Sequence, residues 1–277
     1  MLFLLELAGI FSGILYISGY AVQSPRPARS LTSAAIVSAS AWTAEESCIL
    51  MYRFYDYHPG WCLFLDQVPL LIVVIWPVIL FSAMDLTSHI HAENHWKGLF
   101  AGAAVVATDA LLIEPLCVNA GLWSWKLPGV FNVPPIGILG WFFFALLCMQ
   151  LMGNRRPQGP PSSYDLRLLV LPVIGTHLLL ILTWWGAFRW INFPLPIPVV
   201  VGVAWGISFF MTVTIHKKQT GRGIKKRTLL LRIPAALFFL ALLIFKAGEP
   251  LPLAVYAIAF VLPYVTLMVQ QYRRHVA

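Results

Sequence analysis

Two acidic residues lie where a membrane helix is expected. The stretch 101–141 is strongly apolar, yet Asp109 lies near the middle of the expected helix and Glu114 follows five residues later, directly before Pro115. A carboxylic acid inside a span costs ~2.5–3.5 kcal/mol on insertion scales, so it usually has a function or a partner. A buried carboxylic acid stays protonated more readily and can donate its proton to a reacting group. These residues therefore indicate acid catalysis.

Three more acids and six aromatic residues belong to the same candidate site. Glu45 and Glu46 are adjacent, about 100° apart on a helix, so at most one of them faces a given cavity. Asp109 and Glu114 are about 140° apart and need not converge. Asp66 is expected near the outer end of the third span. The remaining candidate substrate-binding residues are aromatic: Trp42, Tyr52, Tyr55, Trp123, Trp125 and Trp141.

Each of these groups also has a structural interpretation. The acids are suited to hydrogen bonds between helices, with Thr43, Thr108 or Asn119 as partners. The aromatic residues are typical of the belt at a membrane–water interface. The alternative is that some rings line a site and stabilise a cation with their π faces.

Composition identifies the class of protein. The chain has 277 residues, of which 59% are hydrophobic and 11% charged, and its mean hydropathy is +0.78. A soluble domain carries about 25% charged residues, so this is a polytopic membrane protein. The net charge of +8 resides in loops between spans, which favours contact with membrane lipid and excludes nucleic acid as the expected partner.

A histidine cluster is the one candidate metal site. His89, His91 and His95 occur together, and the i, i+4 pair His91–His95 has the spacing of metal ligands. No second histidine cluster accompanies it, so we predict no metal. No glycine-rich phosphate loop or dinucleotide fingerprint occurs either, so we predict no cofactor.

The hydropathy pattern predicts an all-α bundle of about eight or nine transmembrane helices. The nine candidate spans cover residues 3–22, 32–52, 63–84, 98–121, 136–152, 168–188, 195–215, 228–246 and 251–271. We expect one membrane domain, 1–277, in which 1–152 forms the site and 153–277 supports it.

The basic residues predict the orientation. Fourteen of the nineteen Lys and Arg lie in the first, third, fifth and seventh loops and the C-terminus, four lie in the opposite loops, and Arg232 lies inside the eighth span. By the positive-inside rule, the N-terminus lies outside and the C-terminus in the cytoplasm of a cell (inner) membrane.

Two blocks of residues resemble a known family. The first contains Glu45-Glu46, then 52–57 (YRFYDY), Val68-Pro69-Leu70 and Trp76-Pro77. The second contains Asp109, Glu114-Pro115, Trp123-Ser124-Trp125, Val133-Pro134 and Gly140-Trp141. Over residues 40–150 the chain is similar to the carotenoid biosynthesis membrane-protein family, which includes carotenoid 1,2-hydratases of bacteria and archaea. It departs from the family in having Glu114 where Asp is usual, and Gly137 where Asn is usual.

The resemblance implies a reaction on a lipophilic isoprenoid substrate, with other enzymes of the same pathway as possible partners. A buried acid would protonate a C=C bond, and water would capture the cation. We assign the role of proton donor to Asp109, the deepest acid. Glu114 and either Glu45 or Glu46 would hydrogen-bond Asp109 or position the water molecule. Trp123, Trp125 and Tyr55 would flank the cation.

Three alternatives share these residues. A lycopene-type or other terpene cyclase would quench the same cation with a second double bond. A proton-coupled transporter or lipid carrier would use the acids as a proton relay. A structural subunit of a lipid-synthesis complex would need no proton transfer by these acids. An enzyme site predicts that at least three of Glu45, Glu46, Asp66, Asp109 and Glu114 line one cavity.

Overall fold

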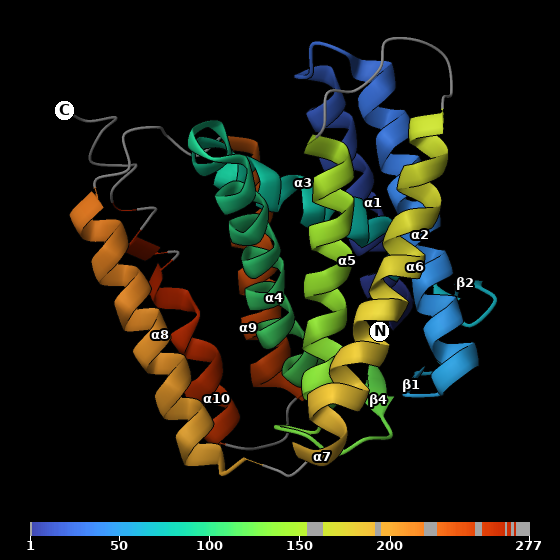
Figure 1. Cartoon of the computed structure of the whole chain (residues 1–277). Coiled ribbons are helices and arrows are strands. Elements are labelled where there is room, and N and C mark those ends of the chain that lie inside the picture. Colours follow the sequence, from blue (N-terminus) through green and yellow to red (C-terminus); the bar gives the residue numbers. More distant parts are fainter. Residues whose placement is uncertain are drawn as a thin grey trace.

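The computed structural model describes residues 2–153, 163–191, 195–218, 226–246, 251–263, 265–266 and 269. In this part of the chain, nine helices longer than a single turn alternate in direction (Figure 1). They are α1 (Leu2–Val22), α2 (Pro27–Tyr52), α3 (Leu70–Glu93), α4 (His95–Asn119), α5 (Pro135–Gly153), α6 (Ser163–Thr183), α8 (Ile197–Lys218), α9 (Lys226–Lys246) and α10 (Leu251–Ala259). After α6 the chain continues through a π-helical turn, Trp184–Phe188, into the short α7 (Arg189–Ile191). The predicted all-α bundle is confirmed.

Six helical segments in the described residues are long and apolar enough to cross a membrane. They are Leu2–Val22, Leu70–Ser88, His95–Asn119, Pro135–Met152, Ser163–Ala187 and Arg227–Ile244. The apolar parts of α8 and α10 are shorter, at Ile197–Val213 and Leu251–Pro263. α2 is 26 residues long but rich in serine and alanine, so it falls below the hydropathy of the other spans.

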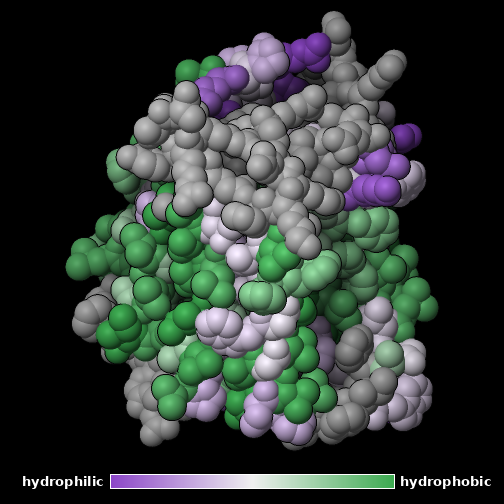
Figure 2. Space-filling view, turned by 90° about the vertical axis from the view of Figure 1, so that its left-hand side faces the viewer, coloured by the Kyte–Doolittle hydropathy of each residue, from purple (hydrophilic) through white to green (hydrophobic). Residues whose placement is uncertain are grey.

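The outer surface is apolar where a lipid bilayer would contact it. Figure 2 shows a broad hydrophobic band on one side of the molecule, with hydrophilic residues gathered toward its top. Large apolar side chains such as Leu4, Leu182 and Phe210 are mostly exposed, whereas Ser40, Ser82 and Thr228 are buried. This distribution is the one expected of a membrane protein. The orientation of the termini stays a prediction.

A short β-ribbon joins the loops that follow α2 and α4. β1 (Tyr55–Tyr57) pairs antiparallel with β4 (Trp123–Trp125), so that Tyr55 lies opposite Trp125 and Tyr57 opposite Trp123. Because side chains alternate along a strand, these four rings share one face, and Asp56 and Ser124 lie on the exposed face. The second ribbon, β2 (Phe64–Leu65) with β3 (Val68–Pro69), turns back at Asp66. The β1–β4 pair thus brings two distant aromatic motifs together.

Two ion pairs attach α9 to the first half of the bundle. α9 packs against α1, α3 and α4, while α8 and α10 form a pair beside α4 (Figure 1). Arg232 donates to both carboxylate oxygens of Asp109 on α4, at 2.8 and 2.9 Å. Arg227 donates to both oxygens of Asp85 on α3, at 2.7 and 3.0 Å. A charge within a span needs a partner, which explains why α9 docks here despite its distance in sequence.

Candidate functional site

One large cavity runs through the bundle. It has a volume of about 920 Å³ and is bordered by α1, α2, α3, α4, α5, α6, α9 and the β1–β4 ribbon. This volume lies toward the upper end of the ~300–1,000 Å³ range of small-molecule sites. Most of its lining is aliphatic or aromatic, and its acids are Glu45, Asp109 and Glu114. Three of the five acids considered from the sequence therefore line a single cavity.

Glu45 is held by hydroxyl and indole donors. Tyr55 and Tyr57 both donate their hydroxyls to Oε2, the latter at 3.2 Å, and Trp76 Nε1 donates to Oε1 at 3.1 Å. Tyr55 and Tyr57 reach the same oxygen because they are two residues apart on a strand and so share a face. Burial and the neighbouring Glu45 raise the pKa of both tyrosines well above the usual value, so both hydroxyls keep their protons near neutral pH.

Glu114 is buried and held by indole donors alone. Trp123 Nε1 and Trp125 Nε1 donate to its Oε2 at 2.8 and 3.0 Å, and Trp141 Nε1 donates to Oε1 at 2.9 Å. An indole N–H can donate but cannot accept. All three bonds are strongest to the carboxylate form of Glu114, because a charged acceptor strengthens each of them.

The donors of the two carboxylates contact one another in pairs. The ring centroids of Tyr55 and Trp125 are 4.7 Å apart, and those of Tyr57 and Trp123 are 6.0 Å apart. These are the cross-strand pairs of the β1–β4 ribbon. A third pair, Trp76 with Trp141, joins α3 to α5 at 4.9 Å. Glu45 and Glu114 thus belong to one aromatic network.

Asp109 has a different environment. The guanidinium of Arg232 donates to both carboxylate oxygens of Asp109, and it also donates to Ser82 Oγ at 3.0 Å. The bidentate arginine engages both carboxylate oxygens, so neither oxygen is directed at a substrate in the cavity. Asp109 lies five residues before Glu114 on α4, roughly 7.5 Å along the helix axis. The ion pair therefore suits a role in holding α9 and shaping the cavity wall.

Four other residues considered from the sequence do not line the cavity. Glu46 accepts a bond from the Gln67 backbone N–H at 3.1 Å, which ties α2 to the second ribbon. Trp42 Nε1 donates to the carbonyl of Leu65 at 3.0 Å. Tyr52 bonds His177 Nδ1 at 2.9 Å, and Asp66 is exposed in the β2–β3 turn. Since Glu45 faces the cavity, its neighbour Glu46 must point elsewhere, as the 100° spacing requires.

Three residues of the site were not assigned to it from the sequence. Tyr57 shares the strand face of Tyr55, a period-2 signal that was present in YDY. Arg232 was visible as the one basic residue inside a predicted span, and such a residue requires a nearby acid. Trp76 carried no signal of its own beyond its place before Pro77, because its contact with Glu45 depends on how α3 packs against α2.

The histidine cluster is only partly described. The side chains at 89–93 lie outside the described residues, and His95 Nε2 is 3.2 Å from Gln150 Oε1. In the part of the chain that the structure describes, no group of three metal-ligating side chains comes together.

Comparison with known families decides the relationship. The sequence profile described as carotenoid biosynthesis protein matches residues 6–209, well over half of the chain. The chain belongs to the carotenoid biosynthesis protein family. No curated protein and no solved structure matches it significantly. The family gives the protein a role in carotenoid metabolism. The matched region contains both Glu45 and Glu114 with all six of their donors, whereas α9 lies beyond it.

Gly137 provides a test of the cage around Glu114, that is, of the three indole donors Trp123, Trp125 and Trp141. A Cβ atom at position 137 would lie 2.6 Å from the Trp125 ring, so Gly137→Ala must displace the indole that bonds Glu114. We expect turnover to fall by up to ~10²-fold, as for a misplaced reacting group. Gly175→Ala on α6 is the matched control, since its added Cβ would displace only the end of Leu147 and Gly175 does not line the cavity. Equal turnover of the two variants, measured per amount of folded protein, would contradict the importance of this cage.

The Asp109–Arg232 pair provides a second test. Asp109→Asn leaves Arg232 without its buried counter-charge, which costs ~3–5 kcal/mol in comparable pairs. We expect lower thermal stability in detergent and lower accumulation. The double variant Asp109→Asn/Arg232→Gln should recover both. Turnover of the folded single variant should fall by much less than the ~10²–10⁴ lost with a general acid. A stable but inactive Asp109→Asn protein would instead make Asp109 the proton donor.

Proposed function

We propose that the protein is a membrane enzyme that protonates a terminal C=C bond of an acyclic carotenoid and adds water to the cation. The observation that supports this most strongly is the pair of carboxylates, Glu45 and Glu114, in one largely apolar cavity. Each accepts three hydrogen bonds from aromatic side chains, and the two sets of donors are in ring contact. Membership of the carotenoid biosynthesis family indicates the class of substrate.

We assign the transferable proton to Glu45. Its partners Tyr55 and Tyr57 are hydroxyls, which can accept as well as donate, so a protonated Glu45 keeps hydrogen-bond partners. Because the pKa of both tyrosines is raised, neither competes with Glu45 as the acid. Asp109, our assignment from the sequence, is a poorer donor because Arg232 bonds both of its oxygens.

Glu114 then has a complementary role. We assign it the carboxylate form, because its three indole donors favour a charged acceptor, and in that form it provides a negative charge beside the reacting end. Fixed charges that face developing charge are usually the largest contribution to catalysis. The ring faces of the same aromatic residues add cation–π stabilisation of ~0.5–2 kcal/mol each.

The proposed steps balance in protons and electrons. The π electrons of the terminal C=C bond take the proton of the Glu45 carboxyl group, leaving a tertiary carbocation and a Glu45 carboxylate. A water molecule forms the new C–O bond, and its surplus proton returns to Glu45. The net change is addition of one water molecule, and the enzyme is regenerated. Glu114 keeps the same protonation state throughout.

Cyclisation is the alternative within the same chemistry. The first step is identical, but a second C=C bond of the substrate captures the cation, and a proton is lost at the end. The apolar lining of the cavity is compatible with that route. The two reactions differ in product mass, since only hydration adds water.

A proton-coupled carrier is the alternative of another class. Titratable groups at several positions along the cavity favour a carrier, because Glu45, Asp109 and Arg227 all line it. Against it, Asp109 and Asp85 are each bonded at both oxygens by an arginine, so a moving proton would have to break these pairs.

Expression in a host that makes acyclic carotenoids tests the three functions together. We expect a new pigment heavier than its precursor by one water molecule. An isomer of unchanged mass would replace hydration by cyclisation. If no product forms and the purified protein instead dissipates a pH gradient across lipid vesicles only when substrate is present, the carrier function would hold.

A further inference from the structure

The cavity is long, and its two ends are chemically different. Its lining residues on α1 recur every three or four positions from Leu5 to Gly19, which corresponds to about 21 Å along the helix, and Gln23 extends the lining just beyond the end of α1. Leu5 lies in the cluster of Trp61 and Trp123, at the end that holds Glu114. Gln23 and Arg227 line the opposite end. The cavity therefore has the shape for a linear chain whose reacting end lies at the acids.

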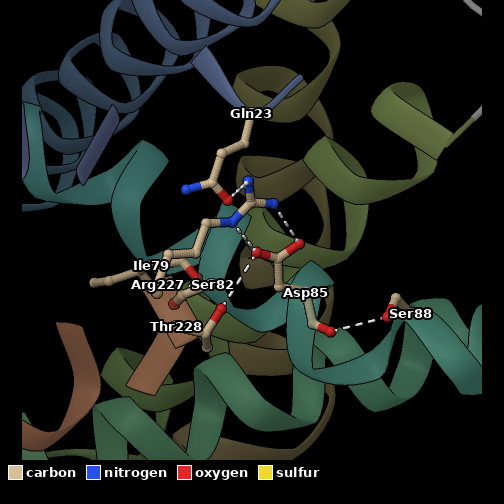
Figure 3. A network of polar contacts seen from close by, with 7 residues as sticks. All are labelled: Gln23, Ile79, Ser82, Asp85, Ser88, Arg227 and Thr228. Carbon is tan, nitrogen blue, oxygen red and sulfur yellow. Dashed lines mark hydrogen bonds and ion pairs between the residues drawn. The ribbon is translucent and has the colours of Figure 1, made fainter. Parts of the chain in front are cut away.

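A fixed polar cluster occupies this opposite end. Arg227 pairs with Asp85 through two nitrogens, and its guanidinium carbon lies 4.1 Å from the centre of the Tyr20 ring. Its third nitrogen, Nη1, donates to Gln23 Oε1 at 3.3 Å, and Thr228 donates to Asp85 at 3.2 Å (Figure 3). The arginine and the aspartate cancel in charge. The cluster is therefore neutral, and it does not favour an anion such as a phosphate.

The arginine fixes which atom of Gln23 is available. Arginine can only donate, so it must face the carbonyl oxygen of the Gln23 amide. The amide nitrogen then points away from Arg227, as Figure 3 shows. Within the part of the chain that the structure describes, no hydrogen bond engages this nitrogen. Gln23 thus presents N–H donors that the cluster does not use.

A small chamber adjoins these donors. It has a volume of about 200 Å³ and is lined by Tyr20, Gln23, Ser24, Pro25 and Arg227. It shares Gln23 and Arg227 with the large cavity, so the two adjoin at this end. The Ser24 hydroxyl accepts bonds from Arg26 N and Ser30 Oγ, at 3.3 and 2.9 Å, and so keeps its own hydrogen to donate. Two donors in a neutral chamber suit an uncharged oxygen acceptor.

We propose that this chamber binds the oxygen-bearing distal end of the isoprenoid chain whose other end lies between Glu45 and Glu114. The inference rests on the proposed function for the identity of the chain, and it adds a specificity site at Gln23 and Ser24. Gln23 is exposed, so an apolar chain end placed there displaces water from the two donors and leaves them without partners, whereas a hydroxyl or keto oxygen replaces that water. For a chain with two like ends, the product of the first reaction is therefore bound in preference to the starting material.

Binding of unreactive chains tests this site independently of catalysis. The probes are two fully saturated isoprenoid chains of equal length, one ending in a hydroxyl and one in a hydrocarbon. Binding is measured by titration calorimetry of the purified protein in detergent. We expect the alcohol to bind the wild-type protein about tenfold more tightly, the effect of one good hydrogen bond. In Gln23→Leu and in Ser24→Ala the preference should fall toward unity, because the alcohol loses a partner and the hydrocarbon no longer leaves that donor without one.

Gln150→Leu is the matched control, because Gln150 bonds His95 and does not line the cavity. It should keep the wild-type preference. Equal affinity of the wild-type protein for both probes would overturn the proposal, and so would a preference that survives in both Gln23→Leu and Ser24→Ala. Because saturated chains cannot be protonated, failure of the hydratase function would appear only in turnover and would leave this binding ratio intact.

Discussion

Glu45→Gln is expected to abolish product formation, with a loss of at least the ~10²–10⁴ that a general acid contributes. The amide keeps the size of the side chain and can still accept a bond from Tyr55 or Tyr57, but it has no transferable proton. The variant should reach the membrane in near-normal amounts. Turnover is measured as product formed per amount of folded protein in membranes that contain the acyclic substrate.

The adjacent acid is the matched control for this substitution. Glu46 lies on the same helix and is also buried, but it bonds the Gln67 backbone and does not line the cavity. Glu46→Gln should keep turnover close to wild type. A reversal, with Glu45→Gln active and Glu46→Gln inactive, would place the proton donor outside the cavity and contradict the assignment.

Glu114→Gln is expected to lower turnover by ~10²–10³, comparable to the loss of a stabilising group in a preorganised charge site. Two effects act together. The fixed negative charge disappears, and the new amide NH₂ must face at least one indole N–H, so two donors oppose each other in a buried site. Turnover per folded protein and thermal stability in detergent measure the two effects separately.

Two further variants separate the effect of losing the Glu114 charge from a general loss of protein stability. Trp141→Phe removes a single donor from Glu114 and should cost less than Glu114→Gln. Glu6→Gln alters another buried acid, which accepts bonds from the backbone of Cys62 and Leu63. It should lower stability but leave turnover per folded protein unchanged. If Glu114→Gln behaves like Glu6→Gln, Glu114 is structural.

The class of the protein and its family followed from the sequence because they depend on local properties. Twenty-residue apolar segments predict helices wherever they occur, and the motifs around Glu45 and Glu114 are contiguous. Those motifs also contained most of the residues that line the acidic end of the cavity. Helical spacing correctly limited Glu45 and Glu46 to one cavity-facing residue.

The hydrogen-bond or ion-pair partner of each acid depends on how distant helices pack, so it could not be predicted from local sequence patterns. Asp109 looked like the best proton donor because it is deepest in its span, but Arg232, more than a hundred residues later, pairs with it. Likewise, Trp76 reaches Glu45 only because α3 packs against α2. The ribbon register that places Trp125 opposite Tyr55 depends on two loops that are distant in sequence.

The reaction in heavy water is the most direct test of proton transfer from Glu45 to the substrate. Purified protein is incubated with an acyclic carotenoid in D₂O, the product is returned to ordinary water, and its mass is determined. The wild-type product should carry one water molecule and one deuterium bound to carbon, and Glu45→Gln should form none of it. A product without carbon-bound deuterium, or an equal amount of labelled product from Glu45→Gln, would contradict acid catalysis by Glu45.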